Sequence, residues 1–499
     1  MVAAAAPEGN LPTVPGAKPG KTRRASIMTR ILAGLSKESD TKATWVVGIL
    51  TLASNPGLEA LKEGVGMKLL EMPRFRSVAK TPMGRRMYWK ELSVSDMDME
   101  YHFRERPDIK TQAQLVDFVG DPWADSPPDL DKPLWVTTLI PEMEDGRAVL
   151  VTNISHTIAD GVSSIEVLFR LLADAENPAE MAKARPPPKR KQKTFGPINR
   201  ALLFLSGVKE GLFLILGKPD GPSSLRPKGS LAPTKKICAF ADPIDIDRVK
   251  AVKLKMENAT LNDVMITVLT MCIKAFVDEQ DDQKVRRGAK FRAQFPVNLR
   301  KKGQDVFKDG SPGNTWGYGY TRMFLSDKAH ADGPVALAWK VKRNFDKVKE
   351  KPTPIVSKWV AAAIIPLLPQ KFFNKIVLDG LGQKSTAQLS SVASATKRVK
   401  LVGTSVEIED MNFVLHSPLL SYLGLISYAG KVHVIVNLDK KVGVDPQEIV
   451  KHWAPSFEKL EAAVNEEAAK TSTGAPLENM AGNFGAAAAA VGLAVFVSA

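Results

Sequence analysis

Apolar positions recur along this chain with two spacings, alternate residues and every third or fourth residue, which predict strands and helices respectively. In the first half, apolar runs predict buried strands at residues 45–52, 133–140 and 147–154. Segments with a single apolar face predict helices at residues 55–72, 111–124 and 163–175. The mixture of both kinds of element predicts an α/β fold.

The same two patterns return after residue 235. Strands are predicted at residues 290–300 and 313–325, and a hairpin over 425–439 turns near Ala429 and Gly430. A long helix is predicted over 260–279, where Thr260 and Asp263 have the spacing of a capping box. A closing helix is predicted over 445–464.

Two apolar segments with basic residues lie outside these elements. Residues 197–218 have an apolar helical face, but Lys209 and Glu210 interrupt it, which argues against a transmembrane span. A helix docked at a membrane interface and a helix packed on the core remain equal interpretations. A second such segment, residues 354–378, is broken by Pro366 and Pro369.

The chain divides by composition into five parts. Residues 1–41 predict a disordered basic tail, residues 42–182 and 235–470 two globular parts, and residues 183–234 a linker with the amphipathic segment. Residues 183–193 are basic, rich in proline and free of acids, and are a candidate contact for anionic lipid. Residues 471–499 end in an Ala-rich apolar tail, a weak candidate for a membrane span.

Overall composition narrows the classes of function. The 499 residues are 44% hydrophobic and 25% charged, as in folded proteins, so they can build one large core or two medium ones. Cys238 and Cys272 suit neither a disulfide framework nor a metal site, and the six histidines show no zinc-binding spacing. The net charge of +15 favours anionic partners, but no nucleic-acid-binding motif accompanies it.

His156 is the candidate catalytic residue. It follows an apolar strand, and Asp160 and Gly161 follow it, with Gly161 expected to allow a sharp turn. A histidine is the one side chain whose ordinary pKa suits a general base near neutral pH. On these residues alone, a structural histidine at a strand end is the more common case. Asp160 is expected to pair with an arginine and to hold the turn.

Several motifs occur in an order that resembles a known family. They are P-L-W at 133–135, S-H-T-I-A-D-G at 155–161, M-P-R-F-R at 72–76, the N-D-V helix at 262–264, P-V-N-L-R at 296–300 and G-N-T-W-G at 313–317. Together with residues 421–453 they resemble the wax ester synthase/diacylglycerol acyltransferase (WS/DGAT) family. That family lies within the chloramphenicol acetyltransferase-like, coenzyme A-dependent superfamily.

The resemblance implies roles for individual residues. It implies His156 as the general base, with Asp160, Gly161 and Arg300 as support and an Asp160–Arg300 pair between the halves. It also implies a substrate channel near a further set of positions. Among these, Pro133 and Trp135 are also expected to pack the strand before the motif, and Asp263 is also expected to cap a helix. This set is Pro133, Trp135, Asn262, Asp263, Asn298, Gly313, Asn314 and Gly317.

The sequence departs from the family pattern at two places. Ser155 replaces the first histidine of the superfamily's doublet, and S-S-V-A-S-A-T at 390–396 replaces a family loop near the channel. The second departure leaves the acceptor preference open. The missing D-F-G-W-G element argues against plant BAHD acyltransferases, and the missing carrier domain argues against a condensation domain.

The function implied by this resemblance is transfer of a fatty acyl group from acyl-CoA to a long-chain alcohol, to diacylglycerol, or to both. The implied fold is two chloramphenicol acetyltransferase-like subdomains around a central channel. Acyl-CoA is then a co-substrate, no permanent cofactor or metal is expected, and a membrane or lipid-droplet surface is the expected partner. The endoplasmic reticulum or a lipid droplet is the expected location, with a plastid as alternative. Two rival functions stay open, a non-catalytic lipid-binding protein of the same fold and an acyltransferase with a soluble acceptor.

Overall fold

Strand β2 (Trp45–Leu52) lies at the centre of the first large sheet, as its apolar run predicts. It pairs antiparallel with β7 (Ala148–Ser155) on one side and with β15 (Glu407–His416) on the other. The sheet order is β5-β6-β7-β2-β15-β14-β8, and β5 and β6 pair in parallel. Its outer strands are β5 (Phe103–Glu105), β6 (Trp135–Ile140), β14 (Val399–Leu401) and β8 (Leu172–Asp174).

The computed structural model describes the residue ranges given at the end of this paragraph. The amphipathic segments 197–218 and 354–378 and the apolar tail 481–499 lie partly or wholly outside them. The described ranges are 20–26, 29–30, 32, 44–80, 87–124, 127–174, 202, 204–205, 208–209, 217–226, 235–300, 312–349, 351, 353–364, 384–416 and 421–472.

The second large sheet belongs to the second half of the chain. Its order is β10-β17-β16-β13-β11-β12, with β9 also paired to β17. Strand β13 pairs in parallel with β11 and β16, and the other pairings are antiparallel, so this sheet is mixed as well. The strands are β9 (Lys236–Phe240), β10 (Ile244–Asp245), β11 (Arg292–Asn298), β12 (Trp316–Arg322), β13 (Ala387–Ala393), β16 (Ser421–Tyr428) and β17 (Lys431–Asp439).

The predicted hairpin of residues 425–439 is confirmed. Strands β16 and β17 are joined by Ala429 and Gly430, both in the left-handed region with φ of 45° and 81°. Two successive residues of positive φ produce the turn whose twist matches that of paired strands.

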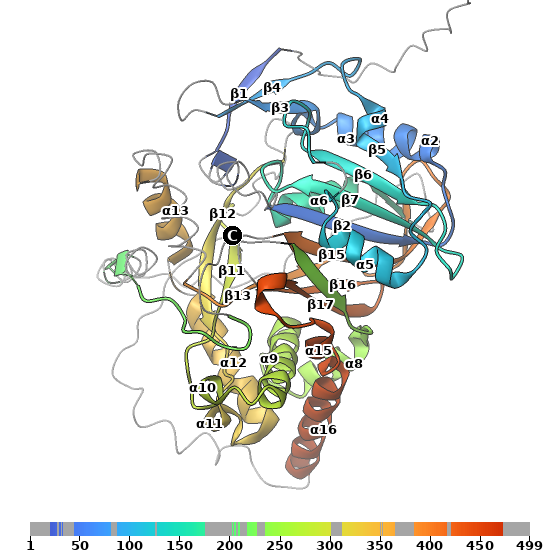
Figure 1. The fold of residues 1–499 in the computed structure, drawn as a ribbon. Helices are drawn as coiled ribbons and strands as arrows, with labels where there is room; N and C mark the ends of the chain where they lie inside the picture. The colour runs from blue at the N-terminus through green and yellow to red at the C-terminus, as the bar shows by residue number, and fades with distance from the viewer. Residues whose placement is uncertain are drawn as a thin grey trace, which may run out of the picture.

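Helices cover the second sheet on its outer side (Figure 1). The central one is α9 (Leu261–Glu279), which is buried along most of its length and is contacted by α8, α12, α15 and α16. Its predicted capping box is confirmed, because Thr260 and Asp263 exchange side-chain and backbone hydrogen bonds. The surrounding helices are α8 (Ile246–Leu254), α10 (Gln283–Arg286), α11 (Asp327–His330), α12 (Gly333–Lys349), α15 (Gln447–Val450) and α16 (Trp453–Ser472).

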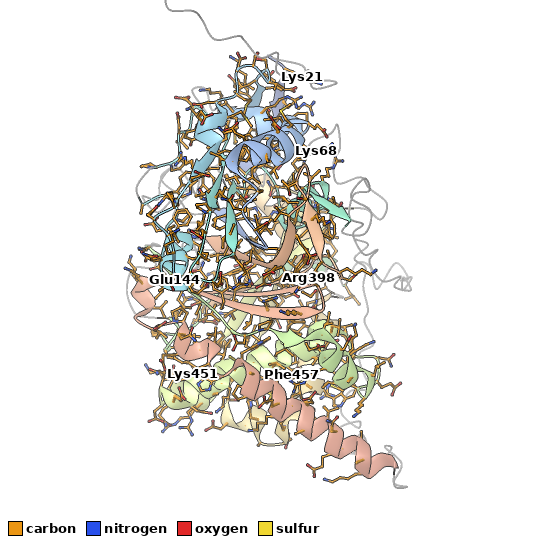
Figure 2. All side chains as sticks on the ribbon, turned by 90° about the vertical axis from the view of Figure 1, so that its right-hand side faces the viewer. Lys21, Lys68, Glu144, Arg398, Lys451 and Phe457 are labelled. Atoms are coloured by element: carbon orange, nitrogen blue, oxygen red, sulfur yellow. The ribbon has the colours of Figure 1, made fainter. Side chains whose placement is uncertain are left out.

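The two halves stack one above the other and stay distinct when seen from the side (Figure 2). In that view Lys21 and Lys68 mark the first half, and Lys451 and Phe457 mark the helical layer of the second. The first half also contains α4 (Met99–His102), α5 (Gln112–Gly120) and α6 (Gly161–Arg170), while α13 (Thr353–Ile364) lies beside β12. The predicted boundary at 183–234 does not assign every strand to the sheet of its own half. Strands β14 and β15 come from the second half of the chain but belong to the first sheet.

The helix predicted over 55–72 consists of three consecutive pieces. They are α2 (Leu58–Leu61), a π-helical turn over Lys62–Gly66 and α3 (Met67–Leu70). A β-carbon on Gly64 would lie 2.5 Å from the carbonyl oxygen of Val402, so a glycine is needed where this helix meets the turn after β14. The expected apolar face is present, because Leu61, Val65 and Leu69 are buried.

The expectation that residues 1–41 form a disordered tail is wrong for part of that segment. Strand β1 (Thr22–Arg24) pairs antiparallel with β4 (Tyr88–Glu91), which pairs with β3 (Ser77–Lys80) in a small third sheet. Three polar residues carry no strand pattern of their own, so β1 depends on its partner. Thr29 and Leu32 are buried as well, and the contact of Thr29 with Asn314 is described below.

Candidate functional site

Strand β7 brings His156 to the space between the two large sheets. The strand is paired on both sides and ends at Ser155, and the backbone nitrogen of His156 then donates to the carbonyl oxygen of Thr44 at 2.7 Å. Ser155 is buried, and its hydroxyl lies 2.8 Å from that of Thr157. The serine that replaces the first histidine of the doublet therefore stabilises the loop from within.

Asp160 is the N-cap of helix α6 and joins the two halves. One carboxylate oxygen accepts from the backbone nitrogen of Ser163 at 2.9 Å, as an N-cap side chain does. The other accepts from the backbone nitrogen of Thr315 at 2.7 Å and lies 2.8 Å from the guanidinium of Arg300. The predicted Asp160–Arg300 pair is thus present, and both side chains are buried.

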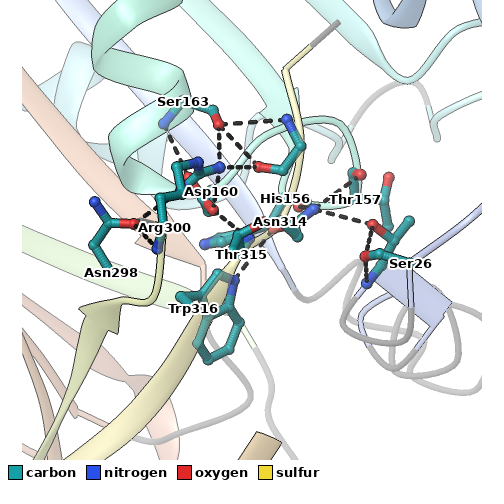
Figure 3. Close-up of polar contacts among 12 residues, drawn as sticks. Ser26, His156, Thr157, Asp160, Ser163, Asn298, Arg300, Asn314, Thr315 and Trp316 are labelled. Carbon is teal, nitrogen blue, oxygen red and sulfur yellow. Dashed lines mark hydrogen bonds and ion pairs between the residues drawn. The ribbon is translucent and has the colours of Figure 1, made fainter. Parts of the chain in front are cut away.

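Arg300 holds several other groups of the loop (Figure 3). The same guanidinium nitrogen, Nη2, donates to the hydroxyl of Ser163 at 2.7 Å and to the carbonyl oxygen of Gly313 at 2.9 Å. Its Nη1 donates to the side-chain oxygen of Asn298 at 3.3 Å. Because Ser163 comes from the first half and the other two from the second, this cluster fixes the loop after His156 against the opposite half.

The side chain of Asn314 binds backbone groups of the loop that begins at His156. Its side-chain nitrogen donates to the carbonyl oxygens of His156 and Thr157 at 3.0 and 3.1 Å and lies 3.2 Å from the hydroxyl of Thr29. Its side-chain oxygen accepts from the indole nitrogen of Trp316 at 3.2 Å. Figure 3 shows Asn314 at the centre of these groups. The amide therefore connects the loop, β12 and the N-terminal segment.

Gly161 has a different role from the one expected. It is the first residue of α6, its φ is not in the left-handed region, and a β-carbon there would meet nothing within 4 Å. The turn from β7 into α6 therefore does not require a glycine. Its open surroundings belong to a cavity, which it lines.

This cavity has a volume of about 420 Å³ and lies between the two large sheets. One wall is formed by β2, β7, β15 and helix α6, and the other by β11, β12, β13 and β16. Most lining side chains are apolar, and polar ones, among them Asn298, Arg300 and Ser390, line the cavity together with His156. A largely apolar cavity with a few converging polar groups is typical of a small-molecule site.

His156 lines this cavity and is only partly accessible. Its ring lies 6.0 Å from that of Trp316, measured between centroids, and its Nδ1 atom is buried. Burial lowers the pKa of His156 below its usual value, and the nearby Asp160 carboxylate opposes this shift. A histidine with a lowered pKa is neutral at neutral pH, which is the form that accepts a proton.

Five of the expected site residues line the cavity: His156, Asp160, Gly161, Asn298 and Arg300. The rest of the set does not line it. Asn262 accepts at 2.9 Å from the hydroxyl of Ser391, a lining residue of β13, and Asp263 caps α9. Gly313 and Asn314 lie behind the loop of His156 as its supports.

Three of the positions expected near the channel have structural roles in the fold. A β-carbon on Gly317 would lie 2.0 Å from the carbonyl oxygen of Pro354, so this glycine allows α13 to pack on β12. Trp135 is buried in β6 with its indole nitrogen 2.7 Å from the carbonyl oxygen of Phe75, and its ring stacks on His102. Pro133 lies just before that strand and does not line the cavity.

Sequence reasoning missed Ser163 and Thr315 as members of the site. Ser163 is buried at the third position of α6, where its hydroxyl bonds Arg300 and Gly313. The aspartate three residues before it signals a helix cap, but the contact with Arg300 depends on the fold. The stretch 390–396 does reach the cavity, since Ser390, Ser391, Val392 and Ala393 line it.

The described part of the chain meets neither the requirements of a metal site nor those of a membrane-spanning helix. Its histidines, cysteines and carboxylates form no group of three that could hold a metal ion. None of its helices is long and apolar enough to cross a membrane.

Comparisons with known proteins agree with this arrangement. Residues 39–216 match the family model for the wax ester synthase/diacylglycerol acyltransferase catalytic domain, and residues 313–461 match the model for the WS/DGAT C-terminal domain. Wax ester synthase/diacylglycerol acyltransferase 5 of Arabidopsis thaliana is 23% identical over 476 residues, which cover 86% of this chain and 92% of the relative.

Solved structures share the fold. The wax ester synthase/diacylglycerol acyltransferase of Marinobacter aquaeolei VT8 aligns with a TM-score of 0.59 and 17% identity, covering 88% of this chain and all of the other. A trichothecene 15-O-acetyltransferase of Fusarium sporotrichioides aligns with a TM-score of 0.61 and 13% identity, covering 87% and 95%. The expected α/β acyltransferase fold with two subdomains is thereby confirmed.

Proposed function

Because the chain belongs to the wax ester synthase/diacylglycerol acyltransferase family and is an acyl-CoA-dependent O-acyltransferase, we propose that His156 is the general base of this transfer. The acyl group moves from acyl-CoA to a long-chain alcohol, to diacylglycerol, or to both. The observation that carries the proposal is the placement of His156 in an apolar cavity between the halves, on a loop anchored by buried contacts.

In this mechanism the neutral imidazole acts directly on the acceptor. Since Nδ1 is buried, Nε2 is the nitrogen that takes the hydroxyl proton as the acceptor oxygen attacks the thioester carbon. The new carbon–oxygen bond gives a tetrahedral intermediate, whose collapse breaks the carbon–sulfur bond. The imidazolium then returns its proton to the departing thiolate, so the products are ester and free CoA. No covalent acyl-enzyme is needed.

The surroundings of His156 support substrates with long alkyl chains. The cavity lining is mostly apolar, so an alkyl chain is stabilised there by about 0.8 kcal/mol for each buried methylene. Acyl-CoA enters as a co-substrate, and the net charge of +15 favours its phosphates. No permanently bound cofactor is part of the proposal.

Labelled palmitoyl-CoA offered with hexadecanol or with diacylglycerol tests the function. His156→Ala should lower kcat by a factor of about 10² to 10⁴, the usual contribution of a general base, without changing the unfolding midpoint. His452→Ala is the matched control, because His452 lies on the outer helical layer beside Glu279, away from the cavity. Equal turnover by His156→Ala and wild type would overturn the assignment of the base.

The same assay separates the rival functions. Absence of product with every acceptor would favour a non-catalytic lipid-binding protein of this fold. Product formed with water-soluble alcohols or amines, at a kcat/KM equal to that with hexadecanol, would favour a soluble acceptor.

We further propose that the enzyme works at the surface of the endoplasmic reticulum membrane or of a lipid droplet. Trp359 on α13 is 60% exposed, and Phe204 and Leu205 in the amphipathic segment 197–218 are 53% and 61% exposed. Large apolar side chains exposed near basic residues suit the interface of an anionic membrane. Deleting residues 183–217 should reduce flotation with vesicles of phosphatidylcholine and phosphatidylserine, and Trp359→Ser should reduce it further. Unchanged flotation of both variants would refute this docking surface.

A further inference from the structure

Gly48 stands in the middle of the central strand of the first sheet, facing the cavity. In strand β2 it is paired with Thr152 of β7 on one side and with Phe413 of β15 on the other. All three residues line the cavity and are partly accessible, although the strands around them are buried in the fold. A glycine inside a strand weakens the strand, and it often marks a place where a ligand approaches the backbone.

The protein itself does not require a glycine at this position. The φ of Gly48 is not in the left-handed region, and a β-carbon would meet only the carbonyl oxygen of Thr152, at 3.9 Å. Other strand glycines differ, since a β-carbon would lie 2.0 Å from the Pro354 carbonyl oxygen at Gly317 and 2.7 Å from the Phe295 ring at Gly319. Packing explains those two glycines, whereas the space in front of Gly48 belongs to the cavity.

The cavity wall continues from His156 along β7 and β2. Ile154, Thr152 and Leu150 are the successive lining residues of β7, and their partners on β2 are Val46, Gly48 and Leu50. The first two pairs are partly accessible, and the third, Leu150 with Leu50, is buried. The accessible part of this wall therefore narrows to a closed end at the third pair.

Helix α6 and the end of strand β14 enclose the same space. Ile165 and Leu168 of α6 line the cavity opposite the sheet, and both are partly accessible. Val65, Leu171 and Leu401 also line it, and all three are buried. These five residues are apolar, so they add apolar surface to the passage.

The length of this passage matches a long alkyl chain. Strands rise about 3.3 Å per residue, so Thr152 lies roughly 13 Å and Leu150 roughly 20 Å beyond His156 along β7. An extended alkyl chain with bonds of about 1.5 Å and angles near 111° advances about 1.25 Å per carbon. Roughly ten carbons therefore reach Gly48, and roughly sixteen reach the closed end.

We propose that Gly48 sets the chain length that the enzyme accepts, because the alkyl chain of one substrate passes over its backbone on the way to the Leu50–Leu150 end. The missing side chain leaves room for the part of the chain beyond about the tenth carbon, as the spacing along β7 implies. This inference rests on the proposed transfer at His156. It adds a specificity-determining residue that takes no part in the chemistry.

Gly48→Ala and Gly48→Val test the proposal with two ladders of substrate. One ladder runs from octanoyl-CoA to stearoyl-CoA with octanol as the fixed acceptor, and the other from octanol to octadecanol with octanoyl-CoA as the fixed donor. Gly48→Val should retain wild-type kcat/KM for the eight-carbon member and lose at least tenfold for the sixteen-carbon member of one ladder, with Gly48→Ala between the two. The ladder that responds identifies whether the acyl chain or the alcohol chain occupies this passage.

Unchanged profiles in both ladders, or equal losses at every chain length, would overturn the proposal. Valine suits a strand, so the unfolding midpoint of Gly48→Val should stay at or above that of wild type, which excludes misfolding as the cause. The palmitoyl-CoA and hexadecanol reaction of wild type separates the two proposals. If wild type turns over and the variant profile is unchanged, only the role of Gly48 fails, whereas an inactive wild type removes the proposed function itself.

Discussion

Replacing Arg300 by methionine should destabilise the folded chain far more than replacing a surface arginine. Arg300 is buried, and its guanidinium lies 2.8 Å from the carboxylate of Asp160, which is also buried. Removing one member of a buried ion pair costs about 3–5 kcal/mol, because the other charge stays buried without its counterion. The carboxylate keeps two backbone donors, from Ser163 and Thr315, so a loss near 3 kcal/mol is expected.

A double-mutant cycle measures the pair itself. Asp160→Asn keeps the shape of the side chain and its ability to cap α6, since asparagine is as good an N-cap as aspartate. The double variant Asp160→Asn/Arg300→Met should then be more stable than the sum of the single losses predicts, by a coupling energy of about 2 kcal/mol. Urea unfolding followed by tryptophan fluorescence, with the slope of the transition compared across variants, provides the free energies.

Arg248→Met is the matched control for this cycle. Arg248 pairs with Glu461 at the surface, and its side chain is 48% exposed. An exposed pair contributes only about 0–1 kcal/mol, so this variant should remain close to wild type. A loss below about 1 kcal/mol for Arg300→Met, or losses that add within about 0.5 kcal/mol in the cycle, would refute the structural role assigned to the pair.

Two further predictions concern the loop of His156 and the response to acid. Asn314→Ala removes the side-chain nitrogen that donates to the carbonyl oxygens of His156 and Thr157. The kcat should fall about tenfold or more while KM changes little. Asn314→Asp keeps the shape of the side chain but puts an acceptor oxygen in place of the donor nitrogen, so it should not restore activity. Burial lowers the pKa of His102 to about 4, so the unfolded chain binds more protons below pH 6.5 and stability is lost as the pH falls. Between pH 7 and pH 5 this histidine should account for about 2 kcal/mol of that loss. His102→Gln should therefore show a smaller decrease in unfolding free energy over that range, and an identical decrease would contradict the assignment.

Local patterns allowed several parts of the fold to be predicted, because their causes lie within a few residues. The capping box of Thr260 and Asp263 depends on a spacing of three, and the turn at Ala429 and Gly430 on two residues that join alternating strands. Asp160 was expected to pair with an arginine, but Arg300 was chosen by the family resemblance and not by any local signal. The structure brings these two residues together across the halves.

Other parts depend on contacts between distant residues, which no local pattern encodes. Strand β1 consists of Thr22, Arg23 and Arg24, and only its pairing with β4 makes it a strand. Strands β14 and β15 join the first sheet, although several apolar strands of similar pattern could have paired with them, so the pattern does not identify their partners. The importance of Gly48 also follows only from the empty space in front of it.

The exchange of strands between the halves also limits how substrates reach His156. Strand β15 is paired with β2 from Ile408 opposite Leu52 to His416 opposite Trp45, and β2 in turn is paired with β7, which carries His156. Moving the halves apart as rigid bodies would break this ladder or carry β15 out of the first sheet. Because the ladder forms one wall of the cavity, such a movement would also destroy the site that it opened. The ladder therefore keeps β15 together with β2 and β7 as one wall of the cavity, and we expect substrates to reach His156 through the cavity's own openings.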